Sequence, residues 1–413
     1  MKIRIFVSIL HLYQQTKQIM KKILPLLVIA FGLSQVAKAQ ACPNTDYPIY
    51  YNCSDIEQFV TDYPNCSRLP STLKLPYDGG DLTNYPALLQ LDSISGNLIC
   101  SECEITSFAG LSNLTYVGGA VHINEPHDVI ENLEGLNNLT HIGGSLRFTE
   151  CFTITSTIGL GTLRYLGGFS MSECSNLIEF IGFENIEFIS GNFSIEECGQ
   201  TPQNLNGFES VNFIAGDLTI DENTGMNSLE GLNNLKTLGG DLKIEDNLML
   251  LDLDALTNLS NIVGEIDISD NQELQSLEGL SSLTSIAGSI KINNNESLIN
   301  LTGLDNIDPS GITELTLLNS SILSSCSVNS ICQYITNSLG PHDIVSNAQG
   351  CNSELQISES CSGLNVYENN YLTNQNSNLL KMIDVLGKEY TEHQEGMILL
   401  YIYENGKVIK RMK

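Results

Sequence analysis

A glycine returns along this chain at an almost constant interval, and this regularity restricts the fold more than any other feature. The steps between successive members are 23, 24 or 25 residues. Self-similarity at such a period is typical of repeat architectures, in which each unit packs mainly against its neighbours. The column consists of Gly96, Gly119, Gly144, Gly167, Gly191, Gly216, Gly240, Gly264 and Gly288.

Each glycine is followed by apolar residues two and four positions later, with mostly polar residues between them. Leu218 and Ile220 after Gly216 are one example. This alternation predicts a half-buried strand. The glycine itself is expected at a corner that needs positive φ or a close backbone approach.

The rest of each repeat has apolar residues three apart, as in Leu229, Leu232, Leu235 and Leu238. The Gly and Asn residues between them disfavour a helix, so we expect a short turn and a second, shorter strand. The sequence therefore predicts a mainly β solenoid of about ten coils, about 48 Å long at the spacing of strands.

Seven positions after the glycine, four repeats in succession carry Asn. An inward Asn at a tight corner satisfies turn backbone groups that burial would leave unpaired. Cys can replace it as a small buried side chain. Neighbouring repeats permit a disulfide from Cys174 to Cys151 or to Cys198, and free buried thiols are an equal alternative. The column reads Cys103, Pro126, Cys151, Cys174, Cys198, Asn223, Asn247, Asn271 and Asn295.

The ends of such an array need caps, and cysteines cluster at both ends. We assign residues 40–80 to an N-terminal cap, 81–325 to the repeats and 326–363 to a C-terminal cap with a helix near Val328–Ile335. Three pairings of the four C-terminal cysteines are open. The structural cysteines are Cys42, Cys53 and Cys66 in front and Cys326, Cys332, Cys351 and Cys361 behind.

Residues 1–39 have the features of an export signal. Lys21 and Lys22 precede the apolar run 23–33, and Ala37-Lys38-Ala39 forms a cleavage site. Met20 is a plausible true start. The apolar run is too short to span a bilayer, and we find no other membrane segment, so no transmembrane segment is expected in the mature protein. With export, the even count of twelve cysteines favours disulfides.

The charge of the chain is strongly negative, at −29. Residues 1–38 hold six basic residues and residues 363–413 hold six basic and six acidic ones, which leaves seven basic and 42 acidic residues between them. Such a surface repels nucleic acid and anionic lipid. Cationic partners or divalent ions remain compatible with it.

The repeats resemble a known family. The phrase LEGLNNLTHIGGSLRF (residues 133–148) and two close variants are similar to receptor L-domain repeats, which are leucine-rich-repeat relatives found in extracellular receptor domains and bacterial surface proteins. The resemblance covers roughly residues 81–361. It implies a right-handed, β-helix-like solenoid that binds a partner and does not catalyse a reaction.

The tail resembles a second family. Residues 379–413, with Asp384-Val385-Leu386-Gly387 and the final Gly406-Lys407-Val408 run, are similar to the C-terminal sorting domain of type IX secretion substrates. Strands are expected at 379–386, 397–403 and 408–412, the last two joined by a turn at Asn405-Gly406. An Asn-rich linker, 364–378, precedes them. The resemblance implies recognition by the type IX machinery and a secreted or outer-cell-surface location.

An acidic ladder follows the strands, six positions after each glycine. Like charges at the strand spacing repel each other by about 1 kcal/mol per adjacent pair in water. Bound Ca²⁺ would offset this repulsion, and a solvated, screened turn is the alternative. Apart from Ca²⁺, the sequence indicates no cofactor. The ladder reads Glu102, Glu125, Glu150, Glu173, Glu197, Glu222, Asp246, Asp270 and Asn294.

Three positions before each glycine, an outward column is rich in rings over five repeats. Exposed aromatic residues with an Arg are typical of a recognition patch for sugar or protein, and packing under a loop is the alternative. The exposed face of the main sheet is polar, with no aromatic column. The ring-rich column reads Tyr116, His141, Arg164, Phe188 and Phe213, followed by Thr237, Asn261 and Ser285.

These features predict a secreted or surface protein for recognition or adhesion, with a surface glycan or a protein as partner. A structural or Ca²⁺-binding surface protein without a dedicated ligand is the alternative. A carbohydrate-active β-helix enzyme is a weaker one, because the body has few basic residues and no nucleophile or metalloprotease motif. We therefore expect no enzyme.

Overall fold

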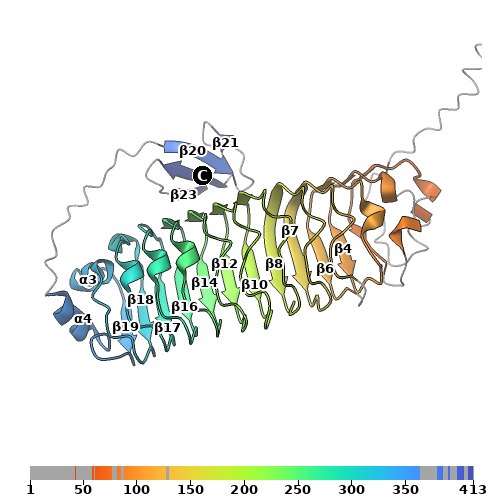
Figure 1. Cartoon of the computed structure of the whole chain (residues 1–413). Helices are drawn as coiled ribbons and strands as arrows, with labels where there is room; N and C mark the ends of the chain where they lie inside the picture. Colours follow the sequence, from red (N-terminus) through yellow and green to blue (C-terminus); the bar gives the residue numbers. More distant parts are fainter. Residues whose placement is uncertain are drawn as a thin grey trace, which may run out of the picture.

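The computed structural model is mainly β, with one long parallel sheet and few helices (Figure 1). It describes Cys42, residues 58–59, 61–76, 81–84, 88–126 and 130–362, and the tail strands at 379–384, 389–390, 398–403 and 408–412. The predicted export signal, Met20, Cys53 and the linker lie outside these residues. None of the described helices is long and apolar enough to cross a membrane.

A first ladder of parallel strands, here called the main ladder, contains one strand from each repeat. Equivalent residues pair in register from strand to strand, as in Ile220 with Ile244 and Ile244 with Ile268. The strands are β2 (Leu73–Lys74), β4 (Leu98–Ser101), β6 (Val121–Asn124), β7 (His141–Thr149), β8 (Tyr165–Ser172), β10 (Phe193–Glu196), β12 (Leu218–Asp221), β14 (Leu242–Glu245), β16 (Ile266–Ser269), β17 (Ile290–Asn293), β18 (Leu315–Leu318) and β19 (His342–Val345).

The second, shorter strand of the repeat also forms a parallel ladder, as predicted. Strands β7 and β8 are long enough to belong to both ladders and join them into one sheet. The remaining members of the second ladder are β1 (Arg68–Leu69), β3 (Ser93–Ile94), β5 (Tyr116–Val117), β9 (Phe188–Ile189), β11 (Phe213–Ile214), β13 (Thr237–Leu238) and β15 (Asn261–Ile262).

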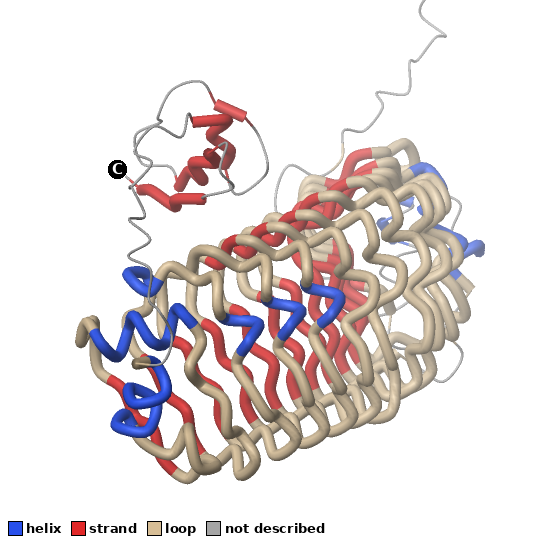
Figure 2. The backbone as a smooth tube through the Cα atoms, turned by 60° about the vertical axis from the view of Figure 1, so that its left-hand side comes forward, coloured by secondary structure: helices blue, strands red, loops and turns tan. Residues whose placement is uncertain are grey.

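Between the two ladders the chain runs through turns and short 3-10 helices rather than α-helices. Figure 2 shows several of these turns side by side along one side of the molecule. The Leu residues at intervals of three point inward from them. The 3-10 helices are η1 (Leu82–Asn84), η2 (Leu88–Gln90), η3 (Ala109–Leu111), η4 (Asp254–Leu256), η5 (Glu278–Leu280), η6 (Thr302–Leu304) and η7 (Pro309–Gly311).

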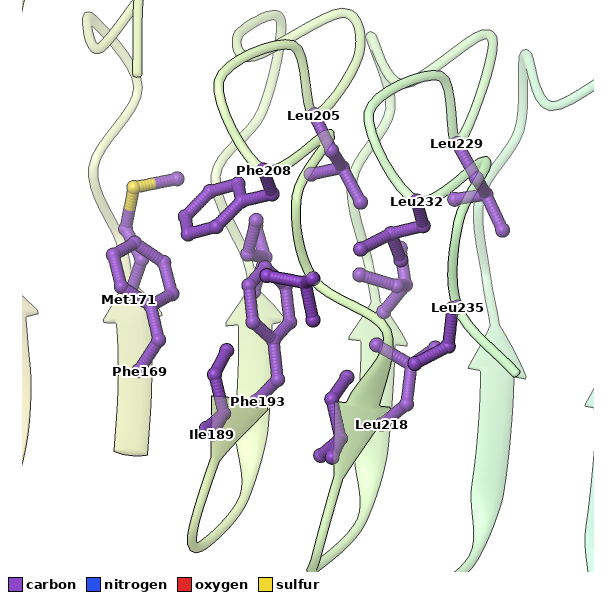
Figure 3. Packing of buried hydrophobic residues seen from close by; sticks show 14 of the residues in the cluster. Phe169, Met171, Ile189, Phe193, Leu205, Phe208, Leu218, Leu229, Leu232 and Leu235 are labelled. Atoms are coloured by element: carbon purple, nitrogen blue, oxygen red, sulfur yellow. The ribbon is translucent and has the colours of Figure 1, made fainter. Parts of the chain in front are cut away.

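The two apolar columns of the main ladder are buried throughout, as predicted, in one continuous core. Figure 3 shows them packed against the apolar residues of the turns. Phe193 illustrates the contact: its ring lies 5.1 Å from that of Phe169 in the preceding repeat and 4.9 Å, edge to face, from that of Phe208 in a turn. Each repeat therefore buries its apolar side chains against its neighbours, which a single repeat could not do alone.

The glycine column serves close approach, not positive φ. None of its nine members has a left-handed backbone. A Cβ on Gly288 would lie 2.7 Å from the backbone nitrogen of Glu265 in the preceding repeat, closer than real Cβ atoms come. Positive φ is found instead at a second glycine column in the turns, for example Gly231 at 110°.

The Asn column makes the contacts that the sequence predicts. The Asn247 Nδ2 donates to the carbonyls of Ile220 and Glu245, at 2.8 and 2.7 Å. Its Oδ1 accepts from the backbone N–H of Asn223, at 3.3 Å. The same acceptor role recurs along the column to Ser320 and Asn347, so buried corner N–H groups are satisfied one repeat after another.

Three cysteines extend this column as free thiols, and no disulfide joins Cys174 to Cys151 or Cys198. The backbone N–H of Cys151 donates to Cys174 Sγ at 3.4 Å, and that of Cys198 donates to Asn223 Oδ1 at 3.1 Å. Burial raises the pKa of Cys198 to about 12. A thiol held neutral in this way is a weak nucleophile, which fits a structural role for Cys198.

Disulfides lie at both ends and in the first repeat. Cys42 pairs with Cys66, and Cys100 pairs with Cys103. In the C-terminal cap the three open pairings resolve to Cys326–Cys351 and Cys332–Cys361. The predicted helix is α3 (Asn329–Thr336), and a second helix, α4 (Glu354–Cys361), contains the last cysteine.

The tail forms an antiparallel sheet of the strands β20 (Leu379–Asp384), β21 (Glu389–Tyr390), β22 (Ile398–Tyr403) and β23 (Val408–Met412). Its order is β21-β20-β22-β23. The three predicted strands are therefore present. The predicted turn at Asn405-Gly406 lies outside the described residues.

We predict that Asn247→Ala lowers the free energy of unfolding by about 2–4 kcal/mol, because it leaves several buried backbone groups without a partner. Asn258→Ala is the matched control, since exposed Asn258 makes one bond, from Nδ2 to the Asn233 carbonyl at 2.7 Å, and should cost about 1 kcal/mol or less. Urea denaturation of both variants measures the difference. Equal losses would contradict the role of the buried column.

Candidate recognition surface

The outward residues of the second ladder form a stack of rings. Tyr116 lies on His141 with ring centroids 4.6 Å apart and planes at 14°. His141 lies on Tyr165 at 4.2 Å and 8°. Phe188 and Phe213 stack at 5.0 Å and 13°. These spacings follow from strand pairing, which places equivalent side chains about 4.8 Å apart. We call Tyr116, His141, Tyr165, Phe188 and Phe213 the aromatic column.

The structure corrects one member of this column. Tyr165, not Arg164, pairs with His141, so Tyr165 takes the outward place and Leu166 is the buried residue. The cause is a register shift between Ile142 and Ser145, where the repeat loses one residue within its Gly-Gly segment. Counting back from the glycine therefore gave the wrong residue. Arg164 is exposed beside the column.

Exposure decreases along the column from Tyr116, which is 41% exposed, to Phe213, which is only 6% exposed. The expectation of an exposed ring is thus wrong for Phe213, which forms a small cluster with half-buried Phe188, Ala215 and Val263. Burial also lowers the pKa of His141, which favours the neutral imidazole within the stack. The exposed part of the column is therefore an uncharged aromatic surface.

The acidic ladder occupies a special backbone conformation that the sequence did not reveal. All its members, from Glu102 to Asn294, have φ between 43° and 59°. Non-glycine residues seldom adopt this left-handed region, and Asn and Asp do so more readily than Glu. Each turn thus consists of a left-handed ladder residue and the buried Asn or Cys that follows it, except after Glu125, where buried Pro126 follows.

Repulsion between neighbouring carboxylates raises the pKa of several members of the ladder. The neighbouring Glu125 carboxylate raises the pKa of Glu150, and Glu197 raises the pKa of Glu222. Burial, followed by the charge of Asp270, raises the pKa of Asp246. At the end of the ladder Asn294 relieves the repulsion, since its Nδ2 donates to Asp270 Oδ1 at 2.8 Å.

At one point three carboxylates gather, two from the ladder and one from the strand beside it. Carboxylate oxygens of Asp221, Glu222 and Asp246 lie within 4.8 Å of one another. Asp221 is already paired, because Lys243 Nζ lies 3.3 Å from its Oδ2 and 2.9 Å from Glu245 Oε2. A cation there competes with an ammonium group. The expectation of Ca²⁺, which covers Glu150, Glu173, Glu197, Glu222, Asp246 and Asp270, stays a prediction.

The exposed face of the main ladder is polar, as expected. In its C-terminal half, lysines neutralise acids: Lys291 Nζ lies 3.3 Å from Glu265 Oε1 and 3.5 Å from Asp267 Oδ2. In its N-terminal half, His122 is paired in register with Arg147, and burial together with this charge lowers the pKa of His122.

Comparison with known proteins agrees with the repeat. Residues 183–274 match the family model of the receptor L domain. An internalin from Listeria monocytogenes is similar in structure, at 14% identity over 72% of this chain and 83% of that chain, with a TM-score of 0.35. A structure of a TLR13–ssRNA13 complex matches at 14% identity over 77% of this chain and 64% of that one, with a TM-score of 0.19. A search of curated proteins found no match. The family match fits a repeat protein for ligand recognition.

We predict that Glu222→Gln raises the melting temperature at pH 7 by relieving repulsion in the ladder. The raised pKa of Glu222 means that its ionisation destabilises the fold as the pH rises through that pKa. The gain over the unchanged protein should therefore shrink as the pH falls towards about 4. Scanning calorimetry across this range measures it.

Glu134→Gln, an exposed position outside the ladder, is the control and should change little at either pH. A lower melting temperature for Glu222→Gln at pH 7 would contradict the account of the ladder.

Proposed function

We propose that this protein is a secreted, non-catalytic recognition protein of the outer cell surface, which binds a glycan or a protein through its aromatic column. The observation that carries the proposal is the outward stack of Tyr116, His141 and Tyr165 on the second ladder. Aromatic residues supply large contact area at a low cost in side-chain entropy. The receptor L-domain match over residues 183–274 fits this role.

The aromatic column is a better contact surface than the main ladder. Charges on the main ladder, such as Lys243 and Lys291, are committed to internal ion pairs. A partner that binds there must replace those pairs and desolvate the groups involved. The column offers ring faces that need no ion pair to be broken, and backbone pairing already fixes the positions of the rings.

The arrangement also supports a rigid display element outside the cell. We infer a right-handed solenoid of about ten coils, closed at its ends by the disulfides Cys42–Cys66, Cys326–Cys351 and Cys332–Cys361. Disulfides are typical of exported proteins. Export through the type IX machinery rests on the tail sequence and on its antiparallel sheet of 379–412.

Replacing Tyr116, His141 and Tyr165 together by Ala should weaken binding to the partner by at least about tenfold, because these rings form the centre of the contact. The assay applies the purified protein to a glycan array and to labelled cell surfaces. The matched control replaces Thr237, Asn261 and Ser285, which occupy the same column further along. Equal binding by the two triple variants would exclude the aromatic column as the contact surface.

In a cell with type IX secretion, deleting residues 379–413 should leave the protein in the periplasm, because the proposed sorting signal is lost. Immunoblots of the cell and of the medium measure this. The proposed route would be contradicted if the shortened protein keeps the melting temperature of the full-length protein and still reaches the cell surface.

A further inference from the structure

The aromatic column does not end at Tyr116. Strand pairing continues it towards the N-terminus, where Ser93 pairs with Tyr116 and Arg68 pairs with Ser93. The order along the second ladder is therefore Arg68, Ser93, Tyr116, His141 and Tyr165. A small hydroxyl side chain stands at the one position between a guanidinium and the stack of rings.

Ser93 leaves the outer face of Tyr116 without a stacked neighbour in the column. The other face of Tyr116 is covered by His141 at 4.6 Å, yet the residue is 41% exposed. His141, by contrast, is covered on both faces, by Tyr116 and by Tyr165. Tyr116 is thus the exposed N-terminal end of this three-ring stack.

The spacing above Ser93 suits one ring. Arg68 and Tyr116 are two strand spacings apart, about 9.6 Å, so a ring over Ser93 lies about 4.8 Å from each. That distance resembles the 4.6 and 4.2 Å already present in the stack. The Arg68 side chain is 81% exposed, so it is available to close over a guest.

Polar groups border the same position. Asp92 Oδ1 accepts from Ser93 Oγ at 2.7 Å and lies 3.7 Å from Arg68 Nε. The Asp92 backbone carbonyl is occupied by Thr115, whose N–H and hydroxyl donate at 2.8 and 3.0 Å. The Asp92 carboxylate, at 44% side-chain exposure, keeps oxygen lone pairs that face solvent. One acceptor and one donor therefore flank an open ring face.

We propose that this position binds a pyranose ring of an uncharged glycan, stacked on Tyr116 above Ser93, with hydroxyl groups donating to Asp92 and accepting from Arg68. The site deepens the proposed recognition function and rests on it. A pyranose has an apolar C–H face for the ring and a rim of hydroxyls for the carboxylate and the guanidinium. The acidic body, with 42 acidic and seven basic residues between positions 38 and 363, disfavours anionic glycans.

Ser93→Phe tests the site, because a ring at this position extends the stack and fills the space for the guest. The probes are cellohexaose, xylohexaose, mannohexaose and chitohexaose, measured by isothermal titration and saturation-transfer NMR on the full chain. We expect at least one probe to bind and Ser93→Phe to weaken it at least about tenfold. Tyr116→Ala should weaken the same probe, since it removes the platform.

Ser285→Phe is the matched control, because Ser285 is also a half-buried serine of the same column, eight repeats away. It should leave binding unchanged, and the melting temperatures of both Phe variants should stay near that of the unchanged protein. Binding that survives Ser93→Phe, or no binding of any probe by the unchanged protein, would overturn the site. The wider recognition function is judged separately by a double variant, His141→Ala with Tyr165→Ala, which keeps Tyr116 and does not touch the position above Ser93.

Discussion

The structure depends on in-register pairing of parallel strands between residues about 24 positions apart. The backbone hydrogen bonds join equivalent positions of successive repeats. A residue type that recurs at one position of the repeat therefore forms a column of like side chains at the strand spacing. Columns of Leu and Ile make the core, a column of Asn and Cys closes the corner, and a column of rings lies outside. The charge repulsion of the acidic ladder is a consequence of the same pairing.

The buried Asn and Cys column shows which side chains the strand pairing accepts at the corner of each repeat. Asn satisfies both its own turn and the N–H of the preceding repeat. Cys151, Cys174 and Cys198 occupy the same place with weaker donors and acceptors, in the part of the core that contains the large rings Phe148, Phe169 and Phe193. At the other end of the main strand, the glycine column permits a close backbone approach between neighbouring repeats without positive φ.

Most of the fold could be predicted from the sequence, because periodic apolar residues report directly which side chains face the core. The strands, the Asn contacts, α3 and three strands of the tail follow from such patterns. The assignment of Arg164 to the outward column failed because one residue is missing inside a Gly-Gly segment, where no side chain marks the register. The left-handed ladder was hidden because Glu gives no local signal for that conformation. The open face of Tyr116 needs the pairing with Ser93, which spans a turn of variable length.

In the proposed function, recognition depends on where the column of rings ends, and that place is set by the register of the second ladder. A double-mutant cycle measures it most directly, through the coupling free energy of His141 with Tyr165 and of His141 with Arg164 in unfolding experiments. The stack predicts a coupling of about 0.5–1.5 kcal/mol for His141 with Tyr165 and close to zero for His141 with Arg164. The opposite order of the two couplings would contradict the register and the aromatic column that is built on it.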